Sequence, residues 1–339
     1  ISSPLRIEGE DVLIRGSGTA THIHNANQEG KPAIIIKPPK GKANLWRICI
    51  EDLRITGNPK SGHGILARKI NEIFLHGITV SYNGGHGIFL DACYEDPRIS
   101  ACLITYNKGS GLALKACHDI VVCGNQFEEN LDAVTCIDSF NLCMTGNNLD
   151  DHLRHGVVIE NTYGSIVSAN MIEECTGFAV VLDRDCYGIT VSANVFAHEV
   201  EGGVDIRDAH GCTISSNTFT IIKGKAIRIS PESGLIAVTG NSFSDSTIGE
   251  NEVKRKENLA GGIVFEGGKG IAFAGNAFTN LTTPAVRVSD SKDMYTLFAG
   301  NLIWGCKSGW ERLRKVKTFG NFTLTKERSS ESKREKEKK

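Results

Sequence analysis

Asparagine recurs along most of this chain at a nearly constant spacing. The steps between successive members are 22, 23, 24, 23, 24, 35 and 25 residues, and the set is Asn125, Asn147, Asn170, Asn194, Asn217, Asn241, Asn276 and Asn301. A repeat of this length is typical of a stacked solenoid, in which each period forms one coil. Because stacking places one coil position above the next, residues that function together are expected in rows across neighbouring coils.

A second pattern runs in phase with the asparagines. A small residue followed by alternating apolar positions recurs about once per period, as in Gly87-Ile88-Phe89-Leu90 and Gly156-Val157-Val158-Ile159. Each coil carries a second short β-type run, such as Ser165-Ile166-Val167, and helical spacing is absent. Together these patterns predict an all-β chain, a single-domain parallel β-helix (solenoid) of about ten or more coils. At one turn of each coil, the asparagine amides are expected to hydrogen-bond to one another as an Asn ladder.

The pattern divides the chain into three regions. Residues 1–43 are interpreted as an N-terminal cap and first irregular coil, and residues 44–322 as the β-helix. The long step between Asn241 and Asn276 predicts a charged loop insertion at 244–260, of the kind that often overhangs a binding face. Residues 323–339 are too polar to pack and are predicted to be a disordered charged tail.

Charge and cysteine content exclude several classes of protein. The net charge is −1, so the basic field that a nucleic-acid binder needs is missing and no nucleic-acid partner is expected. No apolar run reaches the roughly 18 residues of a membrane span. The eleven cysteines are odd in number, several stand beside apolar residues, and none has zinc-finger spacing. They are therefore predicted to be buried free thiols.

Several motifs point to a known family. The run Gly85-His86-Gly87-Ile88 and turns such as Gly124-Asn125-Gln126-Phe127 resemble those of right-handed parallel β-helix repeat proteins of the pectate-lyase-like superfamily, over roughly residues 44–322. The resemblance implies a right-handed β-helix that binds or processes polysaccharide or oligosaccharide, in an extracellular or cell-envelope location. The ordered acidic, Gly-His-Gly and Arg-x-Lys motifs of polygalacturonases are not reproduced, and the Asp-Pro-His-Asp motif of alginate epimerases is absent, so the resemblance carries no mechanism over.

Charged residues gather on the predicted outward face of the central coils. In each main strand the second and fourth positions after the small residue point outward. The resulting candidates for catalysis are Glu160, Asp183 and Asp205 on this face, with Asp132 and His155 at its edge just before the strands. Coils rise about 4.8 Å, so Glu160 and Asp183 are expected to be neighbours, and two close carboxylates raise the pKa of one of them toward that of a general acid. The offset of Asp183 from Asp205 could provide the roughly 6.5–9.5 Å gap of an inverting glycosidase.

Two arginines on the same face are candidates for substrate binding. Arg207 and Arg228 could hold the carboxylate of an acidic sugar, or stabilise an enolate-like intermediate in a lyase. The alternative is an ordinary solvated face, on which neighbouring Asp and Arg form cross-strand ion pairs.

A second constellation is Asp150-Asp151-His152-Leu153-Arg154-His155. Asp151 and His152 are predicted to bind substrate, and the group could instead hold a metal ion or simply form a polar Asx-type turn. Carboxylates in Asp183-Arg184-Asp185 and Arg207-Asp208-Ala209-His210 extend the pattern onto later turns. Ca²⁺ is an open candidate there, although EF-hand spacing is absent.

The sequence therefore supports two functional hypotheses. The first is a polysaccharide-active enzyme, a glycoside hydrolase or lyase, that acts on an acidic glycan along the outer face of the central coils. The second is a non-catalytic carbohydrate-binding, cell-surface or scaffold β-helix. The particular glycan and the oligomeric state are left open.

Overall fold

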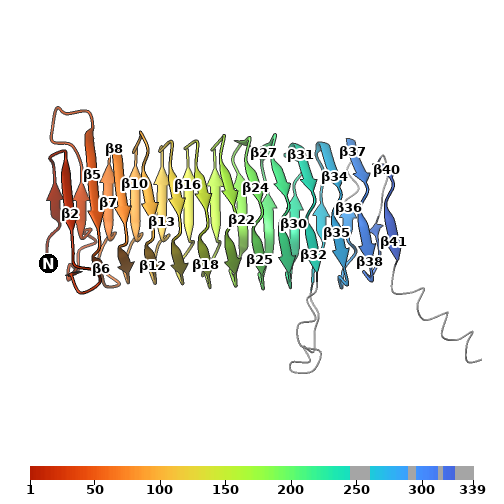
Figure 1. Cartoon of the computed structure of the whole chain (residues 1–339), viewed down its shortest axis with the longest axis horizontal. Coiled ribbons are helices and arrows are strands. Elements are labelled where there is room, and N and C mark those ends of the chain that lie inside the picture. The colour runs from red at the N-terminus through yellow and green to blue at the C-terminus, as the bar shows by residue number, and fades with distance from the viewer. Residues whose placement is uncertain (245–259, 289–294, 312–315, 325–339) are drawn as a thin grey trace, which may run out of the picture. The chain divides into compact units, whose positions relative to one another are not determined.

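The chain folds into short parallel strands joined by tight turns (Figure 1). The computed structural model describes residues 1–244, 260–288, 295–311 and 316–324. Most of the predicted insertion at 244–260 and of the predicted tail at 323–339 thus lies outside the described residues. The described chain divides into two compact units, residues 1–176 and 177–339. Each is a parallel β-helix, and the predicted right-handed parallel β-helix is confirmed.

In the first unit, each coil contributes one strand to each of three parallel sheets. Sheet 1 contains β1 (Leu5–Ile7), β4 (Ile34–Ile36), β7 (Ile65–Arg68), β10 (Ile88–Asp91), β13 (Leu112–Lys115), β16 (Val134–Ile137) and β19 (Val157–Glu160). Sheet 2 contains β2 (Val12–Arg15), β5 (Leu45–Glu51), β8 (Ile70–His76), β11 (Arg98–Ser100), β14 (Val121–Cys123), β17 (Cys143–Thr145) and β20 (Ile166–Ser168). Sheet 3 contains β3 (His22–His24), β6 (Arg54–Thr56), β9 (Thr79–Ser81), β12 (Leu103–Thr105), β15 (Gln126–Glu128), β18 (Asn148–Asp150) and β21 (Met171–Glu173).

The second unit repeats this arrangement. Its sheet 1 contains β22 (Phe178–Asp183), β26 (Gly202–Ile206), β30 (Lys225–Ile229), β33 (Ile263–Phe265), β36 (Val286–Val288) and β39 (Trp310–Glu311). Its sheet 2 contains β24 (Thr190–Ser192), β28 (Thr213–Ser215), β31 (Gly234–Thr239), β34 (Lys269–Ala274), β37 (Tyr295–Ala299) and β40 (Val316–Phe319), with the short β23 (Cys186–Tyr187) and β27 (Ala209–His210) beside it. Its sheet 3 contains β25 (Val195–Ala197), β29 (Thr218–Thr220), β32 (Ser242–Ser244), β35 (Ala277–Thr279), β38 (Leu302–Trp304) and β41 (Phe322–Leu324).

The predicted Asn ladder is present in both units. In the first, Nδ2 of Asn125 donates to Oδ1 of Asn147 at 2.9 Å, and the backbone N–H of Asn125 donates to the same oxygen at 3.0 Å. In the second, the same bonds run at 2.8–3.0 Å along Asn194, Asn217, Asn241, Asn276, Asn301 and Asn321. Each amide thus satisfies buried backbone groups of the turn.

A small residue precedes each ladder asparagine because the turn needs left-handed backbone there. Gly124 and Gly146 have φ of 64° and 65°, and Ala169, Ala193 and Ser216 adopt the same region. Glycine reaches this conformation without a Cβ penalty, whereas alanine and serine adopt it at some cost.

A second asparagine column, which the period did not reveal, lies in the first unit. Asn83 donates to Oδ1 of Asn107 at 2.9 Å, and Asn107 donates to Oδ1 of Asn130 at 2.8 Å. The column spans only these coils, so it is too short to produce a visible repeat. The column also affects the predicted site, because His152 occupies the position that follows Asn130 in the next coil.

The core consists of stacked apolar residues from successive coils. In the second unit the rings of Phe219 and Phe243 stack at 4.7 Å, and those of Phe243 and Phe278 at 4.6 Å. Each is at most 1% exposed. Burying a side chain of this size contributes about 1.5–3 kcal/mol. Stacked coils are needed because one coil alone cannot enclose it.

All eleven cysteines are free thiols, and eight of them are buried, as predicted. Within the described residues, no helix has the length and apolarity needed to cross a membrane.

Candidate functional site

The Gly-His-Gly motifs place two histidines just before sheet 1 of the first unit. The backbone N–H of His86 donates to Nδ1 of His63 at 2.9 Å, and that of Ser110 donates to Nδ1 of His86 at 2.9 Å. The two imidazoles stack with centroids 5.1 Å apart and planes 8° from parallel. A Cβ at Gly85 would lie 2.6 Å from Nδ1 of His63, and one at Gly109 would lie 2.7 Å from Nδ1 of His86. The glycines are therefore needed to seat the rings.

These contacts determine the tautomer of both histidines. An Nδ1 that accepts a backbone N–H carries no proton, so each neutral ring carries its proton on Nε2. Burial lowers the pKa of His63 to about 4, and burial also lowers the pKa of His86, against the opposing charge of Asp132. The ring of Phe89 packs against both, with centroids 5.4 Å and 5.5 Å away. From the sequence alone, the Gly-His-Gly motif indicated only the fold.

Asp132 was predicted to be catalytic, and the structure places it in a closed ion pair. Its side chain is fully buried. Nε of Arg154 donates to its Oδ1 at 2.8 Å, Nη2 of Arg154 contacts its Oδ2, and the N–H of His155 donates to Oδ1 at 3.1 Å. The bond to Asp132 raises the pKa of Arg154. Both carboxylate oxygens of Asp132 therefore already accept hydrogen bonds, and its predicted catalytic role stays a prediction.

His152 was predicted to bind substrate, a role that stays a prediction, and the structure buries its side chain. It is 0% exposed and continues the column of Asn83, Asn107 and Asn130. Its Nδ1 accepts the N–H of Asn130 at 3.3 Å, while its Nε2 is buried with no hydrogen-bond partner. Burial lowers its pKa to about 4. A side chain that replaces a ladder asparagine faces the interior, which the local sequence did not reveal.

Asp151 is exposed, but it lies away from sheet 1. It follows β18 of sheet 3, with left-handed backbone at φ 54°. The preceding Asp150 lies in register with Glu128 and Glu173 on β15 and β21. Burial, together with these neighbouring carboxylates, raises the pKa of Asp150. The predicted six-residue constellation is thus split between the core, sheet 3 and the approach to sheet 1.

Two further predicted catalytic residues lie at sheet 1 of the first unit. Glu160 ends β19 with a half-buried side chain, and His155 lies half-buried just before that strand. Their predicted roles stay predictions.

In the second unit, the predicted acids and arginines form a chain of ion pairs. Nε of Arg207 donates to Oδ2 of Asp205 at 2.6 Å, and Nη1 of Arg228 donates to Oδ1 of Asp205 at 3.1 Å. Arg228 also bonds Glu266 through Nε at 3.0 Å and Nη2 at 2.8 Å. At the other end, Nη1 of Arg207 lies 3.6 Å from Oδ2 of Asp183. The bond to Glu266 is the main cause of the raised pKa of Arg228.

This network contains the cross-strand ion pairs of the alternative interpretation, and the predicted catalytic and substrate-binding roles of Asp205, Arg207 and Arg228 stay predictions. Parallel register places Asp205 directly beside Arg228, and Asp205 is only 1% exposed. Its two oxygens are taken by the two guanidinium groups, which in turn are held by protein carboxylates rather than left open for a substrate. Asp183 differs, because 28% of its side chain is exposed.

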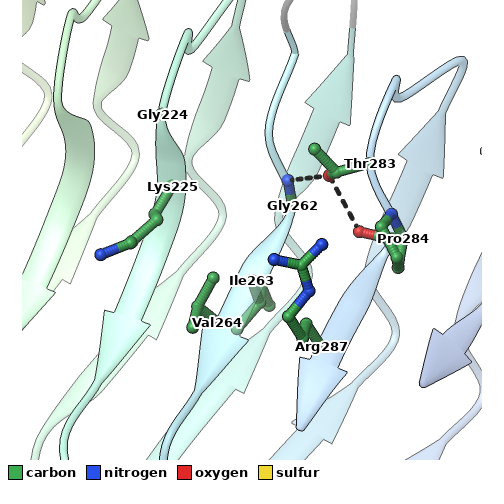
Figure 2. A pocket seen from close by; sticks show the side chains of 8 residues that line it. All are labelled: Gly224, Lys225, Gly262, Ile263, Val264, Thr283, Pro284 and Arg287. Atoms are coloured by element: carbon green, nitrogen blue, oxygen red, sulfur yellow. Dashed lines mark hydrogen bonds between the residues drawn. The ribbon is translucent and has the colours of Figure 1, made fainter.

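A cavity of about 100 Å³ opens on the same sheet, beside β30, β33 and β36 (Figure 2). Its lining comprises Gly224, Lys225, Gly262, Ile263, Val264, Thr283, Pro284 and Arg287. The N–H of Gly262 donates to Oγ1 of Thr283 at 2.8 Å. In Figure 2 the guanidinium of Arg287 extends toward Gly262, and the ammonium of Lys225 points away from it. No candidate site predicted from the sequence includes Arg287.

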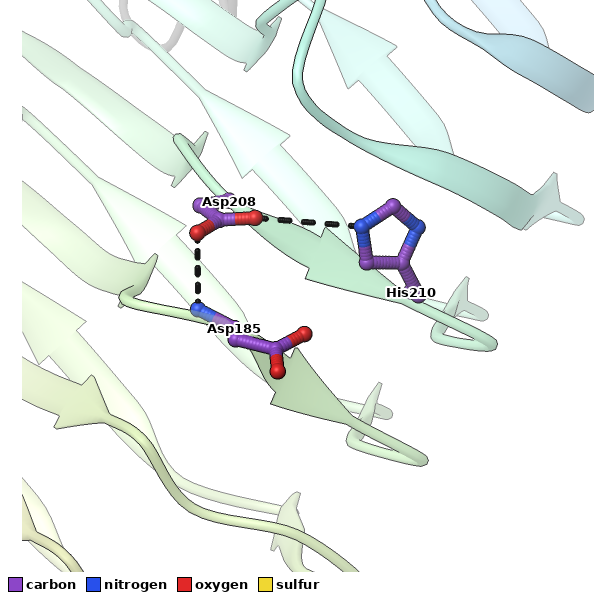
Figure 3. A group of neighbouring side chains, drawn as sticks. All are labelled: Asp185, Asp208 and His210. Carbon is purple, nitrogen blue, oxygen red and sulfur yellow. Dashed lines mark hydrogen bonds and ion pairs between the residues drawn. The ribbon is translucent and has the colours of Figure 1, made fainter.

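A third cluster lies on the turns that follow sheet 1 in the second unit. Asp185, Asp208 and His210 each offer a ligand atom, and these atoms lie within 4.8 Å of one another (Figure 3). Oδ2 of Asp208 accepts the N–H of Asp185 at 2.9 Å, and its Oδ1 lies 3.8 Å from Nε2 of His210. Two carboxylates and an imidazole suit a divalent cation chemically. The sequence had suggested carboxylate ligands on these two turns.

The fold resembles that of several solved proteins, two of which are named as epimerases. A mutant of the periplasmic alginate epimerase AlgG has 12% identity and a TM-score of 0.62, over 87% of this chain and 76% of that chain. The A-module of the mannuronan C-5 epimerase AlgE6 of Azotobacter vinelandii has 16% identity and a TM-score of 0.55, over 93% and 84%. Tailspike protein 3 of bacteriophage CBA120 has 11% identity and a TM-score of 0.62, over 96% and 55%. At these identities the likeness establishes the fold alone.

Family comparisons agree with the fold. No sequence among the curated proteins matches this chain. Residues 10–160 match the family described as right handed beta helix region. Residues 109–280, half of the chain, match a second family, and the protein therefore belongs to the family described as periplasmic copper-binding protein (NosD).

Proposed function

We propose that the protein is polysaccharide-active and binds an acidic glycan on the outward face of sheet 1 in the second unit. The observation that carries this proposal is the cavity that Val264, Thr283 and Arg287 share. A uronic acid offers matching groups: a carboxylate for the guanidinium, hydroxyls for the threonine, and an apolar ring face. A cavity of about 100 Å³ is smaller than a typical ligand pocket. It would therefore hold one substituent of a glycan whose chain lies across the outward face of sheet 1.

The comparisons support a glycan as the partner. Two of the structural neighbours are named as epimerases of alginate and mannuronan, which are polyuronates. We place the protein outside the cytoplasm, in the cell envelope or beyond it, because the family and the alginate epimerase are both described as periplasmic.

For a catalytic step, we assign proton transfer to Asp183. Its carboxylate is partly exposed, with Oδ1 accepting the N–H of Arg184 at 2.8 Å and Oδ2 held only loosely by Arg207. Asp205 and Asp132 lack this freedom, because guanidinium and backbone donors occupy their oxygens. Cleavage could proceed by hydrolysis or by elimination, and the products distinguish the two.

The test is a screen of acidic and neutral polysaccharides with the wild type, Asp183→Asn and Arg287→Ala. Ultraviolet absorbance of an unsaturated sugar, lost in Asp183→Asn, would identify a lyase, and new reducing ends without absorbance a hydrolase. Arg287→Ala should weaken binding of polyuronates at least tenfold, since a charge-assisted pair contributes about 1.5–3 kcal/mol. Arg68→Ala, which removes an arginine paired with Asp91 in the first unit, is the matched control. Equal polyuronate binding by wild type and Arg287→Ala would overturn the proposed site.

If no polysaccharide yields a product, we infer that the protein binds an acidic glycan without cleaving it. The ion pairs of Asp132 and Asp205 favour binding without catalysis, because arginine donors already occupy the oxygens of both carboxylates. Retained polyuronate binding, with neither reducing ends nor absorbance from any substrate, would assign the protein to this class.

A second candidate function is binding of a divalent metal at Asp185, Asp208 and His210. The family description names copper, and imidazole with carboxylates is a ligand set that Cu²⁺ accepts. Calorimetric titration with Cu²⁺ and with Ca²⁺ tests it. His210→Ala should weaken Cu²⁺ binding at least tenfold, whereas His76→Ala, which removes a histidine bonded to Ser100, should not. Identical Cu²⁺ isotherms for His210→Ala and wild type would exclude this site.

A further inference from the structure

The two stacked histidines of the first unit form a rigid pair of uncharged donors. Their Nδ1 atoms are occupied by the backbone N–H groups of His86 and Ser110, so the remaining proton of each ring is on Nε2. Stacking at 5.1 Å holds the rings parallel, and Phe89 packs against both. Both side chains are half-buried, so they are packed in place yet still reach solvent.

We propose that the Nε2–H groups of His63 and His86 form a sugar-binding subsite, in which they donate hydrogen bonds to two hydroxyl oxygens of a glycan. This inference rests on the proposal that the protein binds glycan, and it adds a contact in the first unit that is independent of the cavity beside Arg287. Donors that are prepositioned by packing lose little entropy on binding.

The spacing selects the chemical class of the ligand. Two rings about 5 Å apart present their N–H groups farther apart than the two oxygens of a single carboxylate. Hydroxyl groups at separate positions of one sugar, or on neighbouring sugars, match such a separation. The rings are neutral near pH 7, because burial lowers the pKa of both, so they favour hydroxyl oxygens without requiring a negative charge.

The same tautomer argues against a metal at this pair. Binding a cation through Nε2 would move the proton to Nδ1, where it would face the backbone N–H of His86 or Ser110. Two donors would then oppose each other in a half-buried turn, which costs about 1–3 kcal/mol at each ring. His63 and His86 therefore differ from His210, whose Nε2 lies beside a carboxylate.

The first test is spectroscopic and uses the full wild-type chain. Long-range proton–nitrogen correlation spectra of ¹⁵N-histidine-labelled protein at pH 7 should show the Nε2–H tautomer for both rings. Titration with cellotetraose, a neutral probe, and with tetragalacturonate, an acidic one, should shift the two Nε2–H signals. An Nδ1–H tautomer at either ring, or signals that neither probe moves, would overturn the proposal.

The second test compares variants. Asparagine is the replacement of choice, because Asp132 at the equivalent coil position accepts the next backbone N–H through a side-chain oxygen at 3.1 Å. The double variant His63→Asn, His86→Asn should weaken binding of the responsive probe about tenfold or more, the loss of two hydrogen bonds. His76→Asn is the matched control. If the double variant fails to fold, the wild-type titration decides.

The two glycan proposals fail separately. If tetragalacturonate binding depends on Arg287 and neither probe moves the histidine signals, the subsite is refuted and the cavity stands. If the histidine signals move while Arg287→Ala has no effect, the subsite stands and the cavity is refuted.

Discussion

Nη1 of Arg228 donates to Oδ1 of Asp205 across 3.1 Å, joining neighbouring strands of sheet 1 in the second unit. The carboxylate is buried, whereas the guanidinium keeps 27% of its side chain exposed. This bond makes Asp205 a structural anchor for two arginines, since Arg207 holds its other oxygen.

Replacing Asp205 should therefore destabilise the second unit. In Asp205→Ala, two guanidinium groups lose a shared buried acceptor. Full burial of such a pair would make the loss about 3–5 kcal/mol, and the partial exposure of both arginines reduces our expectation to about 1–3 kcal/mol. Urea unfolding measures it, with exposed Glu232→Ala as the control. A change in unfolding free energy no larger than that of the control would contradict the anchoring role.

Removing one ladder asparagine should also be costly. In Asn217→Ala, the carbonyl of Val191 and the N–H of Asn194 lose bonds of 2.9 Å and 3.0 Å, and the bond to Asn241 disappears. Each buried group left unsatisfied costs about 1–3 kcal/mol, so we expect a loss of about 3 kcal/mol or more. Chemical denaturation provides the measurement, and Ser242→Ala, an exposed change in the same unit, is the control. A loss below 1 kcal/mol would mean that water or a neighbour replaces the amide.

The buried histidine predicts a pH dependence of stability. His152 has a folded pKa lowered to about 4, against about 6.5 when unfolded. Above pH 6.5 both states are neutral and stability is complete. As the pH falls from 6.5 to 4, only the unfolded state gains a proton, so stability is lost, by about 2–4 kcal/mol in total.

The variant His152→Asn should lose less stability over that pH range. Asparagine can accept the N–H of Asn130 as the other members of its column do, but it does not titrate. Unfolding free energies at pH 7, 5.5 and 4.5, compared with wild type, measure the difference. Asp150, with its raised pKa, acts in the opposite direction and cancels in the comparison. Parallel pH profiles for the two proteins would show that His152 does not titrate as described.

Thiol chemistry should separate the cysteines by exposure. Cys143 is exposed, whereas burial raises the pKa of Cys102 to about 11. Because the thiolate is the reactive form, we expect Cys143 to react first with a disulfide reagent in native protein, and all eleven thiols to react after denaturation. Cys143→Ser should remove the fast phase. Fewer than eleven reactive thiols in denaturant without reductant would indicate disulfides.

The fold could be predicted because its determinants are local and repeated. Asn125 and its copies, with a small residue before each and an apolar residue two places on, report the same turn in every coil. The second column of Asn83, Asn107 and Asn130 escaped notice because three copies do not establish a period. The internal position of His152 was missed for the same reason, since only that column identifies it.

The candidate site could be predicted only in part. The outward face of sheet 1 follows from strand alternation, and Asp183, Asp205, Arg207 and Arg228 do lie on the second unit's share of it or at its edge. Their pairing does not follow from the sequence, because it depends on which side chains span the gap between coils. The cavity beside Arg287 is lined by residues before, within and after the long step in the repeat, where coil spacing no longer guides assignment.

The sequence by itself determined the structure of the repeating coil. Every coil must bury the same apolar positions and satisfy the same backbone groups at its turn, so the residues responsible recur at each period. Only the tertiary structure decided which polar side chains are paired with other residues of the protein and which keep a donor or acceptor for a ligand. Asp132 and Asp205 became ion-pair anchors because the next coil placed Arg154 and Arg228 within hydrogen-bonding distance. His63 and His86 retained their Nε2–H groups because stacking brought a backbone donor to each Nδ1.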